Sequence, residues 1–257
     1  MSLVQSIFEC LIDVASHHTV VDIRLGALAI GVRLDDCPCG VAYRFKDETG
    51  LSDARSSDIH SLCGRPADSI LSLITSEIGL ERSVGLAAAN SLVASMITNR
   101  RPGSAHFADG DVIAAGVIKN GDRIAMIGYF QPLVEKIGDR CKLEIYELDT
   151  SMAPFLRDSS DAPQGLKRCD VALITSTTII NGTVDGLLEA AGNCREVVML
   201  GPSTPMVAEA YTKTPVTLLS GALAIDDEIM EAVSRGHSMH HLLSFMRKVN
   251  FRLSTQY

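Results

Sequence analysis

From residue 122 onward, short apolar runs alternate with segments of helical pattern, and this alternation constrains the fold more than any other feature of the sequence. Runs such as VALIT and VVML are continuously apolar, which is typical of strands covered on both faces in a parallel sheet. Helical segments between them, for example residues 183–193, predict βαβ units. Strands are expected at residues 123–128, 142–148, 170–175, 196–201 and 215–221. The sequence therefore predicts an α/β fold with a doubly wound, mainly parallel sheet.

The beginning of the chain follows a different pattern. The stretch SIFECLIDVASHH has apolar positions at near-helical spacing, which predicts a helix. Residues 20–34 instead alternate between apolar and polar positions, which predicts two strands with a shift near a glycine. Within the first of them we expect Val21, Ile23 and Leu25 to point to one side of the sheet.

The run GVAYRFK is a predicted hairpin partner of these strands. Two helical stretches follow, one on each side of Gly79, and small residues in the second would let that helix approach its neighbours closely. A segment rich in Gly, Pro, Asn and Asp comes next, which is typical of a domain boundary. We therefore predict a smaller α+β domain over residues 1–105, followed by the α/β domain over residues 106–257.

Composition limits the function classes. The formal net charge of −8 and the pI of about 5.3 give no general basic surface, which disfavours nucleic-acid binding. No apolar run approaches the roughly 20 residues of a membrane span, and the start of the chain carries acids where a signal peptide would be apolar. We expect a cytoplasmic protein. The helix rich in small residues, 83–97, would suit a homodimer contact as well as a core.

Ligands of open α/β sheets bind at the carboxyl ends of the strands, so the residues that follow each strand indicate function. The first strand is followed by Gly128, which permits close approach of a ligand, and by the aromatic residues Tyr129 and Phe130. This turn is not the glycine-rich dinucleotide fingerprint. After the second strand, Glu147 or Asp149 could contact a ribose or could cap a helix.

The third and fourth strands end in hydroxyl-rich turns, TSTTIINGT and GPSTP, which could hold an anion or serve as helix caps. Because such turns follow neighbouring strands, a polar ligand cleft explains them better than capping alone. The candidate ligand-binding residues are Gly128, Tyr129, Phe130, Glu147, Asp149, Ser176, Thr177, Thr178, Asn181, Gly182, Thr183, Gly201, Ser203 and Thr204.

The motifs GYFQPLVEKI, YELD, LITSTTIINGTVDGLLEAA, VVMLGPSTPM and FMRKVNF resemble the putative heavy-metal chelation domain family. The resemblance implies a Rossmann-like domain, preceded by a domain similar to the N-terminal domain of enolase, and SVGLAAANSL resembles a helix motif of that preceding domain. It also implies a role in heavy-metal chelation or in handling metal-chelating small molecules, with a metal ion or a metal chelate as the bound group. Where relatives carry a glycine-rich run, this chain reads SRGHSMHHLLSF.

These observations leave several functions open. The first is binding of a small anionic or metal-chelating ligand in a cleft between the two domains. The alternative is a Rossmann-like transferase that uses a nucleoside cofactor, with Asp149 on the ribose. The third is direct metal binding through His237, His240 and His241, or through the close pair Cys37 and Cys39. The sequence leaves open whether any reaction is catalysed.

Overall fold

The structure, a computed structural model, describes residues 1–45, 56–98 and 107–253. The first part contains a three-stranded antiparallel sheet and the helices around it. Its elements are α1 (Leu3–Ala15), β1 (Val20–Leu25), β2 (Ala29–Leu34), β3 (Gly40–Tyr43), α3 (Ser56–His60), α4 (Ala67–Leu71), the 3₁₀ turn η1 (Ser72–Thr75) and α5 (Gly79–Thr98). The predicted helix, hairpin and pair of helices are all present. The predicted boundary between residues 105 and 106 lies outside the described residues.

The second part forms an eight-stranded sheet with helices on both faces. Its strands are β4 (Phe107–Asp109), β5 (Arg123–Ile127), β6 (Lys142–Glu147), β7 (Leu156–Asp158), β8 (Val171–Thr175), β9 (Glu196–Leu200), β10 (Leu218–Ala224) and β11 (Met246–Arg252). Its α-helices are α6 (Gln131–Ile137), α7 (Ala162–Leu166), α8 (Thr177–Ile180), α9 (Val184–Ala190), α10 (Glu228–Ser234) and α11 (Met239–Leu242). Short 3₁₀ turns are η2 (Gly138–Arg140), η3 (Thr150–Met152), η4 (Ser159–Asp161), η5 (Ala208–Tyr211) and η6 (Leu243–Phe245).

The strand order β4-β11-β10-β9-β8-β5-β6-β7 confirms the doubly wound, mainly parallel sheet. From β5 the chain adds β6 and β7 on one side, and from β8 it adds β9 and β10 on the other. Strands β11 and β4 complete one edge in antiparallel pairing. The order therefore reverses between β5 and β8, where open sheets of this kind place their ligands.

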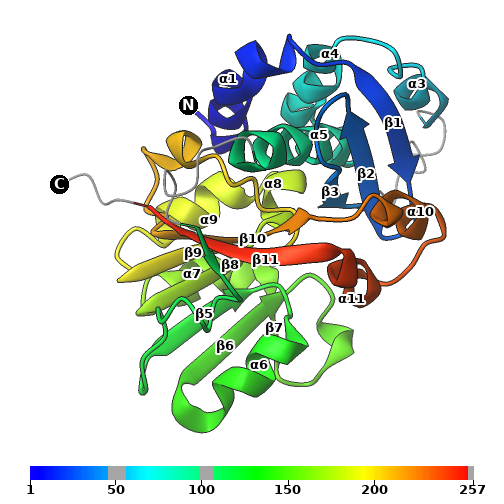
Figure 1. Cartoon of the computed structure of the whole chain (residues 1–257). Helices are drawn as coiled ribbons and strands as arrows, with labels where there is room; N and C mark the ends of the chain where they lie inside the picture. The colour runs from blue at the N-terminus through cyan, green and yellow to red at the C-terminus, as the bar shows by residue number, and fades with distance from the viewer. Residues whose placement is uncertain (46–55, 99–106, 254–257) are drawn as a thin grey trace.

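The apolar runs of the central strands divide their side chains between two cores, which explains their continuous hydrophobicity. In β8, Val171 and Leu173 face the core beneath α6, whereas Ala172 and Ile174 face the core that contains α7, α8 and α9. The second core continues into α1 and α5 of the first part. Figure 1 shows the first part covering that face of the large sheet, with α6 on the opposite face.

Helix α5 lies in the centre of the molecule, between the small sheet and the large one (Figure 1). Its residues Gly85, Ala87, Ala88 and Ala89 are buried within the chain. The small residues therefore serve close packing inside the chain, and this helix offers no such surface to a second copy. A homodimer through another surface stays a prediction.

One strand face differs from the sequence expectation. Ile23 is buried, but Val21 is 45% exposed. The pairing of β1 with β2 shifts between Val20 and Asp22, and such a bulge turns the intervening side chain out of the alternating pattern. Strand β10 also runs on to Ala224 rather than ending near Gly221, because β11 pairs with it along its whole length.

Among the helices that the structure describes, none combines the length and the hydropathy that crossing a bilayer requires.

Candidate functional site

The chain leaves β5 at the point where the strand order reverses, through a turn that only glycine fits well. Gly128 has φ +90°, and a Cβ atom there would lie 3.0 Å from Thr175 Cγ2 on the neighbouring strand β8. The next backbone N–H, that of Tyr129, donates to Glu147 Oε2 at 2.9 Å. Glu147, predicted as a ligand contact, therefore also holds this turn in place.

The hydroxyl groups that follow β8 and β9 lie close together, as the sequence predicted, but they bond within the protein. The Oγ atom of Ser176 lies 2.7 Å from Thr204 Oγ1, and Thr204 Oγ1 donates to the carbonyl oxygen of Gly201. Thr178 Oγ1 donates to the Thr175 carbonyl oxygen at 2.6 Å. Ser176, Thr178 and Thr204 are at most 2% exposed. These bonds stabilise the turns, and ligand binding by the same hydroxyls stays a prediction.

Other predicted residues lie where the first part of the chain contacts the large sheet. Ser203 Oγ accepts a hydrogen bond from the backbone N–H of Tyr43 at 2.8 Å. Arg82 on α5 donates through Nη1 to the carbonyl oxygen of Ile180 at 3.1 Å. Gly182, with φ +78°, lies beside the same guanidinium group. Polar groups at these strand ends thus connect the two parts of the chain.

The remaining predicted polar residues stabilise turns. Asn181 Oδ1 accepts from the backbone N–H and from the hydroxyl of Thr183, at 3.1 and 2.7 Å. Thr183, the last residue of the first hydroxyl-rich turn, occupies the N-cap position of α9, but its hydroxyl makes no capping bond because it donates to Asn181 Oδ1. Asp149 Oδ1 accepts from the hydroxyl and backbone N–H of Ser151, which lowers the pKa of this carboxyl. Thr177 Oγ1 lies 3.1 Å from Thr175 Oγ1.

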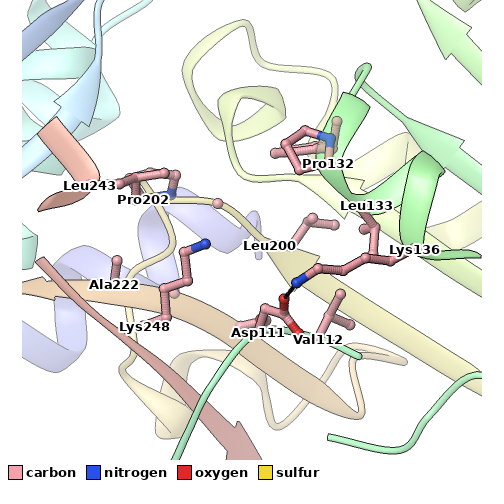
Figure 2. A pocket seen from close by; sticks show the side chains of 14 residues that line it. Asp111, Val112, Pro132, Leu133, Lys136, Leu200, Pro202, Ala222, Leu243 and Lys248 are labelled. Carbon is pink, nitrogen blue, oxygen red and sulfur yellow. Dashed lines mark hydrogen bonds and ion pairs between the residues drawn. The ribbon is translucent and has the colours of Figure 1, made fainter. Parts of the chain in front are cut away.

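A cavity of about 160 Å³ lies at the carboxyl end of β9, between α6 and β11 (Figure 2). We call it the strand-end pocket. Most of its wall is apolar, and Phe130 and Gly201 are the predicted residues that reach it. A second, smaller cavity of about 50 Å³ lies between the end of α5 and the residues around Met206. The strand-end pocket is lined by Asp111, Val112, Phe130, Pro132, Leu133, Lys136, Leu200, Gly201, Pro202, Ser220, Gly221, Ala222, Leu243 and Lys248.

Two lysines and one carboxylate supply the charge of this pocket. Lys136 on α6 forms an ion pair with Asp111. Burial of Asp111 opposes its ionisation, but the bond from Lys136 and those from the backbone N–H groups of Ala114 and Ile113 prevail, so its pKa is lowered. Lys248 extends from β11 toward the pocket (Figure 2), and no side chain in the described part of the chain forms an ion pair with it.

A hydroxyl on the pocket floor is also available. Ser220 on β10 is 8% exposed and lines the pocket, and its Oγ atom has no hydrogen-bond partner among the described residues. Beside it, the backbone of β10 from Gly221 onward pairs only with β11, since β9 pairs with β10 only as far as Ser220. A cation, a free hydroxyl and an apolar wall together suit a small anion that also carries apolar surface.

The histidines and cysteines that the sequence offered as metal ligands do not gather into one site among the described residues. The rings of His237 and His241 are in contact, with centroids 4.3 Å apart, but His237 precedes α11 rather than lying on it, and metal binding by these histidines stays a prediction. Cys37 lies against His18, whereas Cys39 donates to Asp227, so the close pair contacts different partners. Burial raises the pKa of Cys39 to about 12. Within the described residues, no group of three or more His, Cys, Asp or Glu side chains could hold a metal ion.

Sequence reasoning missed the charged groups of the strand-end pocket. Lys248 lies inside the motif FMRKVNF, Lys136 inside GYFQPLVEKI, and Asp111 inside the predicted boundary segment. The available signals were the uncharged residues Phe130 and Gly201, which the sequence listed as candidates, and Ser220, near the end of the fifth predicted strand. Nothing in the local pattern indicated that Lys248 would lie beside the residues after β9.

Comparison with known proteins places the chain in a family. A family model described as "Putative heavy-metal chelation", DUF364, matches residues 111–252, more than half of the chain. The chain belongs to this family. A second model with the same description, DUF4213, matches residues 8–93. The resemblance stated from the sequence motifs is therefore confirmed.

Solved structures of DUF364 family members support the fold. Two crystal structures of family members of unknown function, from Desulfitobacterium hafniense and Pyrococcus horikoshii, match with TM-scores of 0.80 and 0.82 at 20% identity. They cover 97% and 98% of this chain, and 98% and 100% of their own chains. An uncharacterized protein of Methanocaldococcus jannaschii is 29% identical over 154 residues, which span 57% of this chain and 56% of that protein.

Proposed function

We propose that this DUF364 protein binds a small organic anion of the metal-chelating type in the strand-end pocket. The observation that carries the proposal is Lys248, whose ammonium group faces an apolar pocket without a carboxylate partner among the described residues. Lys248 is exposed, so its charge at the edge of the pocket attracts an anion through water as well as across the apolar wall. A carboxylate of the ligand would take the place of the missing partner.

The size of the pocket limits the ligand. An apolar cavity of about 150 Å³ can hold a benzene molecule, and the strand-end pocket measures about 160 Å³. The ring of Phe130 and the side chains of Pro132 and Leu243 offer apolar surface to such a ring. Ser220 Oγ would hydrogen-bond a second polar atom of the ligand. A single-ring carboxylate with a neighbouring donor atom satisfies all of these groups.

The family description connects this ligand class to heavy metals. Because the described side chains form no metal-binding cluster, we propose that a metal arrives as a chelate whose donor atoms come mainly from the ligand. The sequence predicted a ligand cleft between two domains, and our proposal changes this location. All residues that line the strand-end pocket lie between 111 and 248, so the ligand would contact the predicted second domain alone.

Picolinate, a pyridine carboxylate that chelates divalent metals, is a suitable probe for the proposal. We expect isothermal titration calorimetry to detect its binding to the full chain, with and without one equivalent of Zn²⁺. Replacement of Lys248 with methionine keeps an unbranched apolar side chain that is one atom shorter, and removes the charge. Since one charged hydrogen bond contributes about 1.5–3 kcal/mol, we expect Lys248→Met to weaken binding roughly 10- to 100-fold.

Lys213→Met is the matched control, because Lys213 is an exposed lysine that precedes β10 and does not line the pocket. It should leave the affinity unchanged. Equal affinities for the wild type, Lys248→Met and Lys213→Met would contradict the assignment of the pocket. Absence of picolinate binding with a free Zn²⁺ ion bound tightly would instead favour a direct metal site.

A further inference from the structure

Two cysteines that are 25 residues apart in the sequence are in contact just before the amino ends of the neighbouring strands β8 and β9. Cys169 precedes β8 and Cys194 precedes β9, and these neighbouring parallel strands pair Val171 with Glu196. Each cysteine therefore stands two residues before a paired position, at the same level of the sheet. Their Sγ atoms are 3.2 Å apart. No other two cysteine sulfurs make such a contact in the described part of the chain, which includes all seven cysteines.

The surroundings of the pair favour reaction between the two sulfurs. A disulfide bond is about 2.05 Å long, so closing it from 3.2 Å requires the sulfurs to approach by roughly 1.2 Å. The carbonyl oxygen of Leu166 lies 3.4 Å from Cys169 Sγ and 3.3 Å from Cys194 Sγ. Either thiol can donate to the other sulfur, and the hydrogen bond with Cys194 lowers the pKa of Cys169 despite its burial. The pair can therefore present one thiolate beside one thiol.

Access to solvent is limited but present. Cys169 is 9% exposed and Cys194 is half-buried. A small oxidant can reach the pair, whereas a second protein thiol would be hindered. A bond within the chain is therefore favoured over a bond between chains.

We propose that Cys169 and Cys194 form a reversible disulfide within the chain when the protein meets a small peroxide. The Cys169 thiolate attacks a peroxide oxygen, the O–O bond breaks, and the leaving hydroxide takes up the proton that the thiol released and forms a first water, while Cys169 becomes a sulfenic acid. Cys194 Sγ then attacks Cys169 Sγ, the S–O bond breaks, and the leaving hydroxide takes the Cys194 proton to form a second water. For hydrogen peroxide, two thiols lose two electrons and two protons, and one peroxide becomes two waters.

This disulfide lies at the opposite end of the strands from the strand-end pocket. It would link the segment between α7 and β8 to the segment between α9 and β9, and would close the loop from residue 169 to residue 194. Closing a loop of this length restricts the unfolded chain and stabilises the folded protein. We expect a rise in Tm of about 5–10 °C upon oxidation. The proposal is independent of the proposed ligand.

The test treats the reduced full-length protein with hydrogen peroxide, blocks the remaining thiols with iodoacetamide, and maps peptides by mass spectrometry without reduction. We expect a cross-linked peptide pair that contains Cys169 and Cys194, and its disappearance after dithiothreitol. Cys169→Ser and Cys194→Ser should each abolish the cross-link and the Tm rise. Cys63→Ser, which removes an exposed thiol outside the pair, should preserve both.

Differential alkylation of the wild type tests the pair without any substitution. Alkylation of both Cys169 and Cys194 after peroxide has oxidised the exposed Cys63 would overturn the proposal. So would a sulfinic acid at Cys169 without a cross-link, or a dominant disulfide between other cysteines.

Discussion

Replacing Gly85 with alanine is expected to lower the free energy of unfolding by about 3 kcal/mol, the upper end of the usual cost of overpacking a core. Gly85 lies on α5 where the backbone of η1 crosses the helix, and an added Cβ would lie 2.1 Å from Ile74 N and 2.7 Å from Ile74 Cα. Both neighbouring atoms belong to the backbone, so no side chain can rotate away. Tm should fall by roughly 6–12 °C, as followed by circular dichroism during heating.

Gly186→Ala is the matched control for this substitution. Gly186 also lies within a helix, α9, but a Cβ there would meet no atom within 4 Å. Alanine favours the helical backbone by about 0.5–1 kcal/mol over glycine, so Gly186→Ala should stabilise the protein. Equal effects of the two substitutions would show that helix propensity, rather than close packing against η1, determines the cost at Gly85.

The features that the sequence predicted well are those that depend on local periodicity. The small residues of α5 indicated close helix packing, and the contact between Gly85 and Ile74 has this character. Continuous apolar runs predicted strands buried on both faces, and β5, β8 and β9 form close to the expected places, whereas β10 spans Leu218–Ala224 and lies three residues further along the chain than expected. The exposed Val21 shows the limit, because a bulge depends on how two strands pair rather than on the sequence of one.

The candidate site was less predictable for a physical reason. A hydroxyl-rich turn looks the same in sequence whether its groups face a ligand or bond to the protein itself. Ser176, Thr178 and Thr204 bond to nearby protein groups. The strand-end pocket instead depends on Lys248 and Asp111, which come from opposite ends of the second part of the chain and meet only after folding. The contact between Cys169 and Cys194 likewise follows from the register of β8 and β9.

The ion pair between Asp122 and Arg195 carries the second large expected effect. Asp122 precedes β5 and is 6% exposed. Its two carboxylate oxygens accept from Arg195 Nη1 and Nη2 at 2.9 and 2.7 Å, and one of them also accepts from the backbone N–H of Lys119 at 2.7 Å. Such a bidentate pair fixes the start of β5 relative to the start of β9. Removing its charge would leave the exposed guanidinium group of Arg195 without its bidentate partner.

We expect Asp122→Asn to lower the free energy of unfolding at pH 7 by about 2–3 kcal/mol. The control Glu231→Ala, which breaks the exposed ion pair with Arg235, should lower it by at most about 0.5 kcal/mol.

The effect of Asp122 should also depend on pH. The hydrogen bond from Arg195 outweighs burial and lowers the pKa of Asp122 in the folded protein. A lowered folded pKa stabilises the protein above the unfolded pKa of about 3.9, and this stabilisation is lost as pH falls through the folded value. The difference between the wild type and Asp122→Asn in urea denaturation should therefore be constant from about pH 5 to pH 8 and should shrink below about pH 4. A difference that stays constant down to the acid transition would show that the carboxylate charge of Asp122 does not stabilise the fold.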